Sequence, residues 1–90
     1  MATKQFKIGE YVVGGIIQVT TNKNQIEINF NDYFSKKTIL SETFNLTSNT
    51  LRSDIMNFIE DNGTHYYADQ VMKWIESKVD IKPHSYFPSW

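Results

Sequence analysis

His65 and Asp69 are the first pair of residues whose types and spacing could support chemistry. They are four positions apart in a segment with helical periodicity, so their side chains would share one helix face and could bind one metal ion. A structural zinc site needs four protein ligands and a catalytic site needs three. The other histidine, His84, lies in a separate segment near position 90. We therefore expect a surface histidine at the start of a helix, and no metal or other cofactor.

The sequence gives no clearer basis for nucleophilic or acid–base catalysis. None of the serines stands between glycines, as a nucleophile at a strand–turn–helix elbow does, and the chain contains no cysteine. The adjacent carboxylates Glu60 and Asp61 fall at the expected end of a helix, where such groups are usually solvated. The sequence therefore predicts a protein that is not an enzyme.

Two patterns that resemble nucleotide or DNA sites are better explained by structure. Gly14 and Gly15 lie inside an apolar, β-branched run and do not open a helix, so we interpret them as a bulge or bend rather than a phosphate loop. Two expected helices over 51–79 have the order of a helix-turn-helix motif. The exposed positions of the second helix are nearly neutral in sum, which disfavours DNA binding: Asp69, Gln70, Lys73 and Glu76.

Composition bounds the class of protein that could position such residues. The 90 residues are enough for one domain, and the 40% apolar and 14% aromatic content indicates a folded chain. The formal net charge of −1 gives no reason to expect nucleic acid or an anionic membrane as the main partner. No apolar run approaches the ~18 residues of a membrane span, and the first residues lack the apolar region of a signal peptide. We expect a cytoplasmic protein.

The clearest strand signal is the strict alternation over 25–31. It places Ile26, Ile28 and Phe30 on one face and polar side chains on the other. A strand over 4–8 is expected to pair with one over 11–21 through a turn at Gly9-Glu10. A polar connection over 32–37 then leads to a last strand over 38–46, with Leu40, Phe44 and Leu46 on one face and Ile39 on the other. The sequence thus predicts an antiparallel sheet over 4–46.

Two amphipathic helices are expected over 48–79. Residues 47–49 offer capping side chains for the first helix, and Asn62-Gly63 would end it as a C-cap pair that tolerates left-handed geometry. Each helix has an apolar stripe at helical spacing: Leu51, Ile55, Phe58 and Ile59 in the first, and Tyr67, Val71, Trp74 and Ile75 in the second. We therefore predict one α+β domain over 1–90, an antiparallel β-meander of three to four strands followed by two C-terminal helices packed on one sheet face.

A short resemblance suggests an alternative fold. The segment Phe6-Lys7-Ile8-Gly9-Glu10-Tyr11-Val12, followed by Gly15-Ile16-Ile17, resembles the first turn of SH3-like and KOW-type barrels. The resemblance covers positions 6–17 and implies a small barrel with a helical C-terminal extension. Domains of these families mostly bind peptides, RNA or partner proteins, so the resemblance implies a binding module. It does not account for residues 51–79.

The segment 80–90 has an unusual composition. It holds two prolines, which predict irregular structure, and three aromatic residues, Tyr86, Phe87 and Trp90. Chain ends are commonly polar and frayed, so these rings require an explanation. They could cover an open edge of the domain's own core, or they could dock on another subunit. In the second case Tyr33 and Phe34, in the polar connection over 32–37, are candidates for the receiving patch.

These observations favour a non-enzymatic protein-interaction or assembly domain. Its partner would be a second copy of the chain or another protein. Its candidate interaction surface consists of Tyr33, Phe34, Tyr86, Phe87 and Trp90. The alternative is a module that binds single-stranded nucleic acid and stacks bases on Phe30, Tyr33 or Phe34. Lys outnumbers Arg eight to one. Lysine has AT-rich codons, so this bias indicates a low-GC bacterium or one of its phages.

Overall fold

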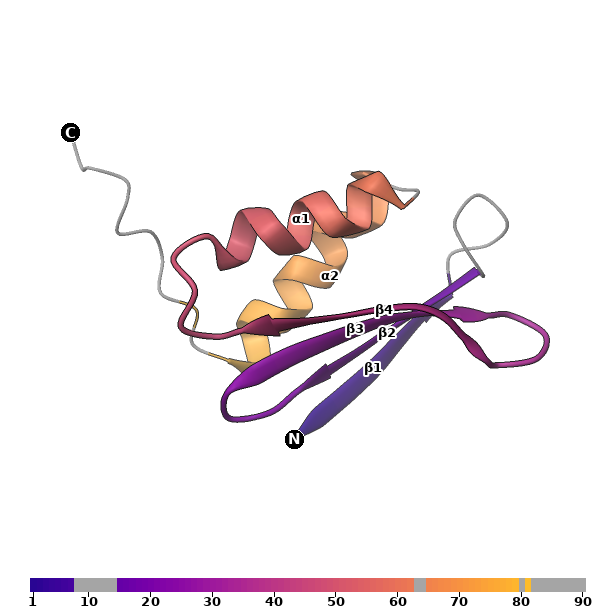
Figure 1. The fold of residues 1–90 in the computed structure, drawn as a ribbon, viewed down its shortest axis with the longest axis horizontal. Coiled ribbons are helices and arrows are strands. Elements are labelled where there is room, and N and C mark those ends of the chain that lie inside the picture. The colour runs from indigo at the N-terminus through magenta and orange to yellow at the C-terminus, as the bar shows by residue number, and fades with distance from the viewer. Residues whose placement is uncertain (8–14, 63–64, 80, 82–90) are drawn as a thin grey trace.

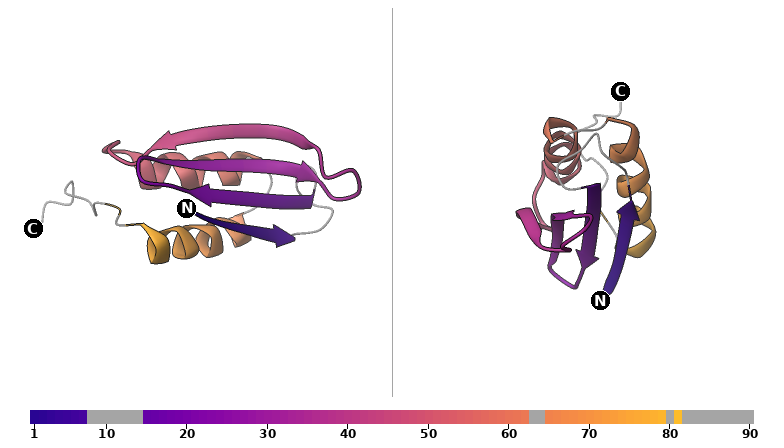
Figure 2. Two further views of the ribbon diagram at one scale, coloured as in Figure 1. Left: turned by 90° about the horizontal axis from the view of Figure 1, so that it is seen from below. Right: turned by 90° about the vertical axis from the view of Figure 1, so that its right-hand side faces the viewer.

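A computed structural model describes residues 1–7, 15–62, 65–79 and 81. Its elements follow one another as four strands and then two helices, and the strands are hydrogen-bonded in the order β1-β2-β3-β4. All strand pairs are antiparallel. Both helices cover the same face of this sheet (Figures 1 and 2). The predicted β-meander followed by two helices is therefore confirmed. The barrel alternative is wrong, because β1 and β4 form opposite edges of an open sheet.

The two faces of the sheet follow from the alternation in β3 (Gln25–Asp32). Its inward side chains Ile26, Ile28 and Phe30 are fully buried against the helices. Its outward residue Glu27 is exposed to solvent, as the sequence predicts. Because successive side chains of a strand point to opposite faces, this one strand separates the core from a polar face.

The first hairpin extends the same core. β1 (Ala2–Lys7) pairs with β2 (Gly15–Thr21) so that Phe6 lies opposite Ile17, and both side chains belong to the core. β1 begins two residues earlier than predicted. Gly15 has a φ of 90°, which only glycine adopts at low cost. The expected turn at Gly9-Glu10, and the rest of the predicted bend, lie outside the described residues.

The pairing of β4 (Thr38–Asn45) with β3 contains a β-bulge. Phe30 lies opposite Leu40 and Asn31 opposite Thr38, so Ile39 is the extra residue. The bulge explains why Ile39 breaks the alternation of this segment in the sequence. Leu40 and Phe44 pack against the core, as predicted, whereas the Ile39 side chain is 52% exposed.

The helices α1 (Leu51–Asp61) and α2 (His65–Lys78) bury the predicted stripes. Sequence periodicity missed two further buried residues of α2, Ala68 and Met72. The N-cap of α1 is Thr50 rather than a residue of 47–49, and its side chain makes no capping hydrogen bond. Asn62 is the C-cap of α1, as predicted, with a φ of −106° that is not left-handed, and Gly63 lies outside the described residues.

Aromatic ring contacts join the helices to the sheet. The Phe58 ring of α1 meets the Phe30 and Phe44 rings edge-to-face, with centroid distances of 5.5 and 5.8 Å. On the other side, Trp74 of α2 meets Phe6 at 6.5 Å. Within the described residues, most aromatic side chains therefore pack in or against the core. The exposed rings in this part of the chain belong to Tyr33, Phe34 and Tyr66.

Candidate functional site

The polar face of the sheet is occupied by its own hydrogen bonds. Gln18 Oε1 accepts hydrogen bonds from Gln5 Nε2 at 3.0 Å and from Asn31 Nδ2 at 3.3 Å, and Asn31 Oδ1 accepts one from the Thr38 hydroxyl at 2.9 Å. This chain of side chains crosses all four strands. The residues that the structure describes on this face include no aromatic ring, and Phe30 is buried on the opposite face. The expectation that Phe30 stacks on bases is therefore wrong.

Exposed apolar side chains gather instead at the tip of the β3–β4 hairpin, residues 32–39. Phe34 is 88% exposed, Tyr33 is 42% exposed, and Ile39 follows them at the base of the loop. The tip projects beyond the sheet at the end away from the N-terminus (Figure 1). Single exposed apolar residues are common on proteins, but three within seven positions of one hairpin make it a candidate contact surface.

Asp32 fixes the conformation of this tip. Its carboxylate Oδ2 accepts hydrogen bonds from the backbone N–H groups of Ser35 at 2.7 Å and Phe34 at 3.0 Å. An aspartate that bonds to the backbone two and three residues later builds a turn without help from the surrounding structure. The hydrogen bond from the Ser35 backbone is the main reason that the pKa of Asp32 lies below its ordinary value. The Oδ2 atom of this carboxylate is thus used in hydrogen bonds within the loop.

Lys36 supports the ring of Tyr33. Its backbone has a φ of 65°, in the left-handed region that residues other than glycine and asparagine seldom adopt. Its ammonium group donates a hydrogen bond to the Tyr33 carbonyl at 2.7 Å and lies 4.9 Å from the centre of the Tyr33 ring. Tyr33 and Phe34 meet edge-to-face at 5.3 Å. The two rings are therefore held by neighbours within the loop.

The base of the tip is closed by backbone and side-chain bonds. The Asp32 N–H donates to the Lys37 carbonyl at 2.8 Å, and the Lys36 N–H donates to the Asp32 carbonyl at 2.9 Å. Asn31, just before the tip, is buried and bonded through both ends of its amide. The backbone of the tip is thus held by hydrogen bonds within the loop, and it carries the exposed Phe34.

The structure gives no support to the metal site considered at His65 and Asp69. Within residues 1–7, 15–62, 65–79 and 81, no three His, Cys, Asp or Glu side chains lie close enough to hold a metal ion. Asp69 is exposed on α2, and the side chain of its predicted partner His65 lies outside the described residues. In the same part of the chain, neither helix is long and apolar enough to cross a membrane.

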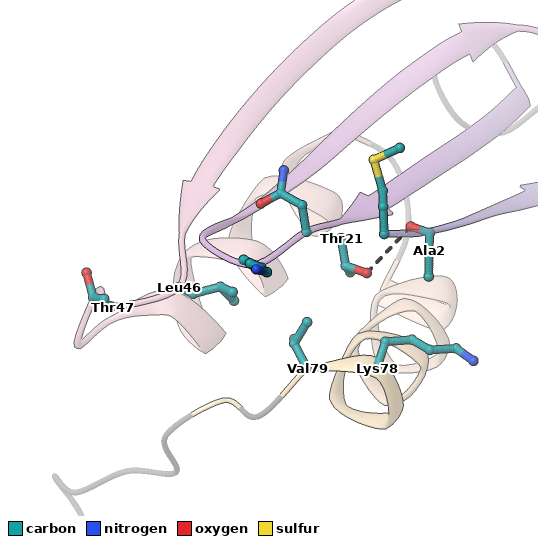
Figure 3. A pocket seen from close by; sticks show the side chains of 9 residues that line it. Ala2, Thr21, Leu46, Thr47, Lys78 and Val79 are labelled. Carbon is teal, nitrogen blue, oxygen red and sulfur yellow. Dashed lines mark hydrogen bonds between the residues drawn. The ribbon is translucent and has the colours of Figure 1, made fainter.

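A pocket lies at the opposite end of the sheet from the tip. It has a volume of about 570 Å³ and lies between the β2–β3 turn, the end of β4 and the last turn of α2. Leu46, Thr21 and Val79 extend toward this common space, whereas Lys78 extends away from it (Figure 3). The two ends of the sheet thus differ in shape, because one projects and the other is hollow.

The structure brings only part of the predicted interaction surface together. Tyr33 and Phe34 lie side by side at the tip, whereas Tyr86, Phe87 and Trp90 lie outside the described residues. Sequence reasoning missed Ile39 as a member of the exposed surface and Lys36 as the support of Tyr33. The break in alternation at Ile39 was a signal for the first. The role of Lys36 depends on its left-handed backbone, which its residue type does not predict.

Within the described residues, we find no arrangement of side chains that identifies an enzyme class or a ligand class. Comparison of the chain with protein-family models, with curated proteins and with solved structures gave no match.

Proposed function

We propose that the protein is a non-enzymatic protein-interaction and assembly domain of the cytoplasm, and that the tip of the β3–β4 hairpin is its contact surface. The observation that supports the proposal is the 88% exposed Phe34 ring on a loop held by Asp32 and Lys36. Aromatic anchors contribute most to protein interfaces when they are exposed and already ordered before binding. The partner we propose first is a second copy of the chain, so that two tips meet.

The edges of the sheet support contact through the tip rather than strand addition. β1 carries Lys4 and Lys7 among its six residues. β4 carries the bulge at Ile39, and Glu42 on the helix-covered side, opposite Ile28. Lysines, bulges and inward-facing charges are the devices by which edge strands avoid pairing with other chains. Both edges are therefore protected, whereas the tip is not.

Measurement of the oligomeric state tests the proposal. We expect sedimentation velocity of the full chain to show a concentration-dependent shift toward a dimer, and Phe34→Ser to abolish it. Tyr66→Ser is the matched control, because Tyr66 is an aromatic residue of α2 that is 71% exposed and lies outside the tip. A monomer at every concentration, or equal loss of association in both variants, would contradict the proposal.

The alternative function, binding of single-stranded nucleic acid, is favoured by one observation. The Lys36 ammonium lies over the Tyr33 ring and Lys37 is the next residue in the same loop, a combination that can hold phosphates and stack bases. The overall charge of −1 opposes it. Salt distinguishes the two functions, because salt weakens phosphate binding but screens the repulsion between the lysines of two facing tips. Retardation of a labelled oligothymidine at about 50 mM salt, lost on addition of salt, would favour the alternative. Its absence would dismiss the alternative.

A further inference from the structure

The pocket at the far end of the sheet has a partly apolar wall. Four of its nine described lining residues are apolar, namely Met1, Ala2, Leu46 and Val79, and none of the nine carries an aromatic ring or a carboxylate. Its volume of about 570 Å³ lies within the range of about 300–1,000 Å³ that is typical of ligand sites. An occupant with aromatic side chains would fit this volume, with its rings against the apolar part of the wall.

The polar groups at this pocket are partly satisfied without an occupant. The Thr21 hydroxyl, which is buried, donates to the Ala2 carbonyl at 3.5 Å. The Asn22 side-chain oxygen accepts the backbone N–H groups of Asn24 at 2.9 Å and Gln25 at 2.8 Å. The pocket thus makes few demands for hydrogen bonds from an occupant. Burial of apolar surface would provide most of the binding free energy.

The course of the chain supplies a candidate occupant. Val79 forms part of the pocket wall, and Ile81, two residues later, packs against the core. The sequence then continues for nine residues beyond Ile81 and includes Tyr86, Phe87 and Trp90. Five residues span at most about 17 Å, so Tyr86 is tethered within a short distance of the wall. The tip of the hairpin is at the other end of the sheet (Figure 1), so it is a poor receiver for the tail of the same molecule.

We propose that this pocket is an aromatic-peptide site and that its occupant is the segment 83–90 of the same molecule, which carries Tyr86 and Phe87. A short tether gives an effective concentration near the millimolar range, which favours the molecule's own segment over that of a second copy. A partner that used the pocket would have to displace this segment. The proposal does not depend on the tip, so either can fail without the other.

Engineered disulfides test the proposal directly, because the full chain has no cysteine of its own. One variant combines Lys23→Cys on the pocket rim with Ser85→Cys beside Tyr86. The control combines Ser85→Cys with Ser77→Cys, an exposed position on the last turn of α2 that does not line the pocket. Ser77 is closer to Ser85 along the chain, so a segment without a docking preference would cross-link more readily to Ser77.

We expect the Lys23–Ser85 variant to form its intramolecular disulfide with an effective concentration about tenfold above that of the control, measured by mass spectrometry in a glutathione buffer. Adding Tyr86→Ser and Phe87→Ser should remove this advantage, because the rings provide the docking energy. Three results would overturn the proposal. They are equal or faster cross-linking to Ser77, disulfides mainly between molecules in dilute solution, and an advantage that survives loss of the two rings.

Discussion

Phe30 and Phe34 lie four residues apart in one hairpin and have opposite environments. Phe30 is 0% exposed and meets Phe58 of α1 edge-to-face, whereas Phe34 is 88% exposed and meets only Tyr33 among the described rings. The first belongs to a strand whose face the helices cover, and the second to a loop that extends past them (Figure 1). The comparison shows that one residue type serves stability in one place and is available for recognition in the other.

This contrast predicts a gradient along the hairpin. Substitutions should cost less stability from Phe30 to Phe34, while their effect on association should increase. The variants below follow this order, from the largest expected loss of stability to the smallest. Each can be measured by urea unfolding, with the two-state slope as a check that the native structure is retained.

Phe30→Ala should reduce the free energy of unfolding by about 3–5 kcal/mol, because it leaves a cavity between the sheet and α1. A domain of this size has about 5–15 kcal/mol of total stability, so the variant could lie close to unfolding. Phe30→Leu fills most of the cavity and should cost less. A loss below about 1 kcal/mol for Phe30→Ala would show that the Phe30 environment is not a packed core.

Asn31→Ala should cost about 1–2 kcal/mol, because it removes a buried amide that bonds to Gln18 and Thr38. Asn29→Ala is the matched control on the same polar face, where Asn29 is less buried and its oxygen accepts one bond, from Ser41, at 2.6 Å. The control should cost less than half as much as Asn31→Ala. Equal losses would mean that burial at the base of the tip adds nothing to these bonds.

Asp32→Asn should destabilise the protein in a pH-dependent manner. The pKa of Asp32 is lowered in the folded protein, chiefly by the Ser35 backbone hydrogen bond. Its charge therefore stabilises the fold above the ordinary aspartate pKa of about 3.9, and this stabilisation is lost as the pH falls through the lowered folded pKa. The stability difference between wild type and variant should be present at pH 7 and shrink in acid. A difference that did not change with pH would contradict the role of the charge.

The hairpin also shows what could be read from the sequence. Alternation at Ile26, Ile28 and Phe30 predicted the buried face, because a one-residue slip would expose all three. The helix stripes predicted most of α1 and α2, but Ala68 and Met72 were missed, since small and flexible side chains add little to a periodic pattern. The bulge at Ile39 was visible only as an irregularity, because bulges depend on pairing with a distant strand.

The sequence predicted which residues the candidate site contains, but not the conformation of the loop that carries them. Two aromatic residues in a polar connection indicated exposure, and Tyr33 and Phe34 are exposed. That the loop is held by Asp32, and that Lys36 adopts a left-handed backbone to reach the Tyr33 carbonyl, depends on three-dimensional geometry. The pocket could not be foreseen at all, since its walls come from four separate segments of the chain.

Phe34→Ser tests the central claim most directly, with urea unfolding and sedimentation velocity performed on the same sample. We expect the free energy of unfolding to stay within about 0.5 kcal/mol of wild type, as for an exposed surface position, while the concentration-dependent association of the wild-type protein is lost. If the variant instead lost stability and kept its association, Phe34 would be part of the folded core energetics, and the hairpin tip would not be a contact surface.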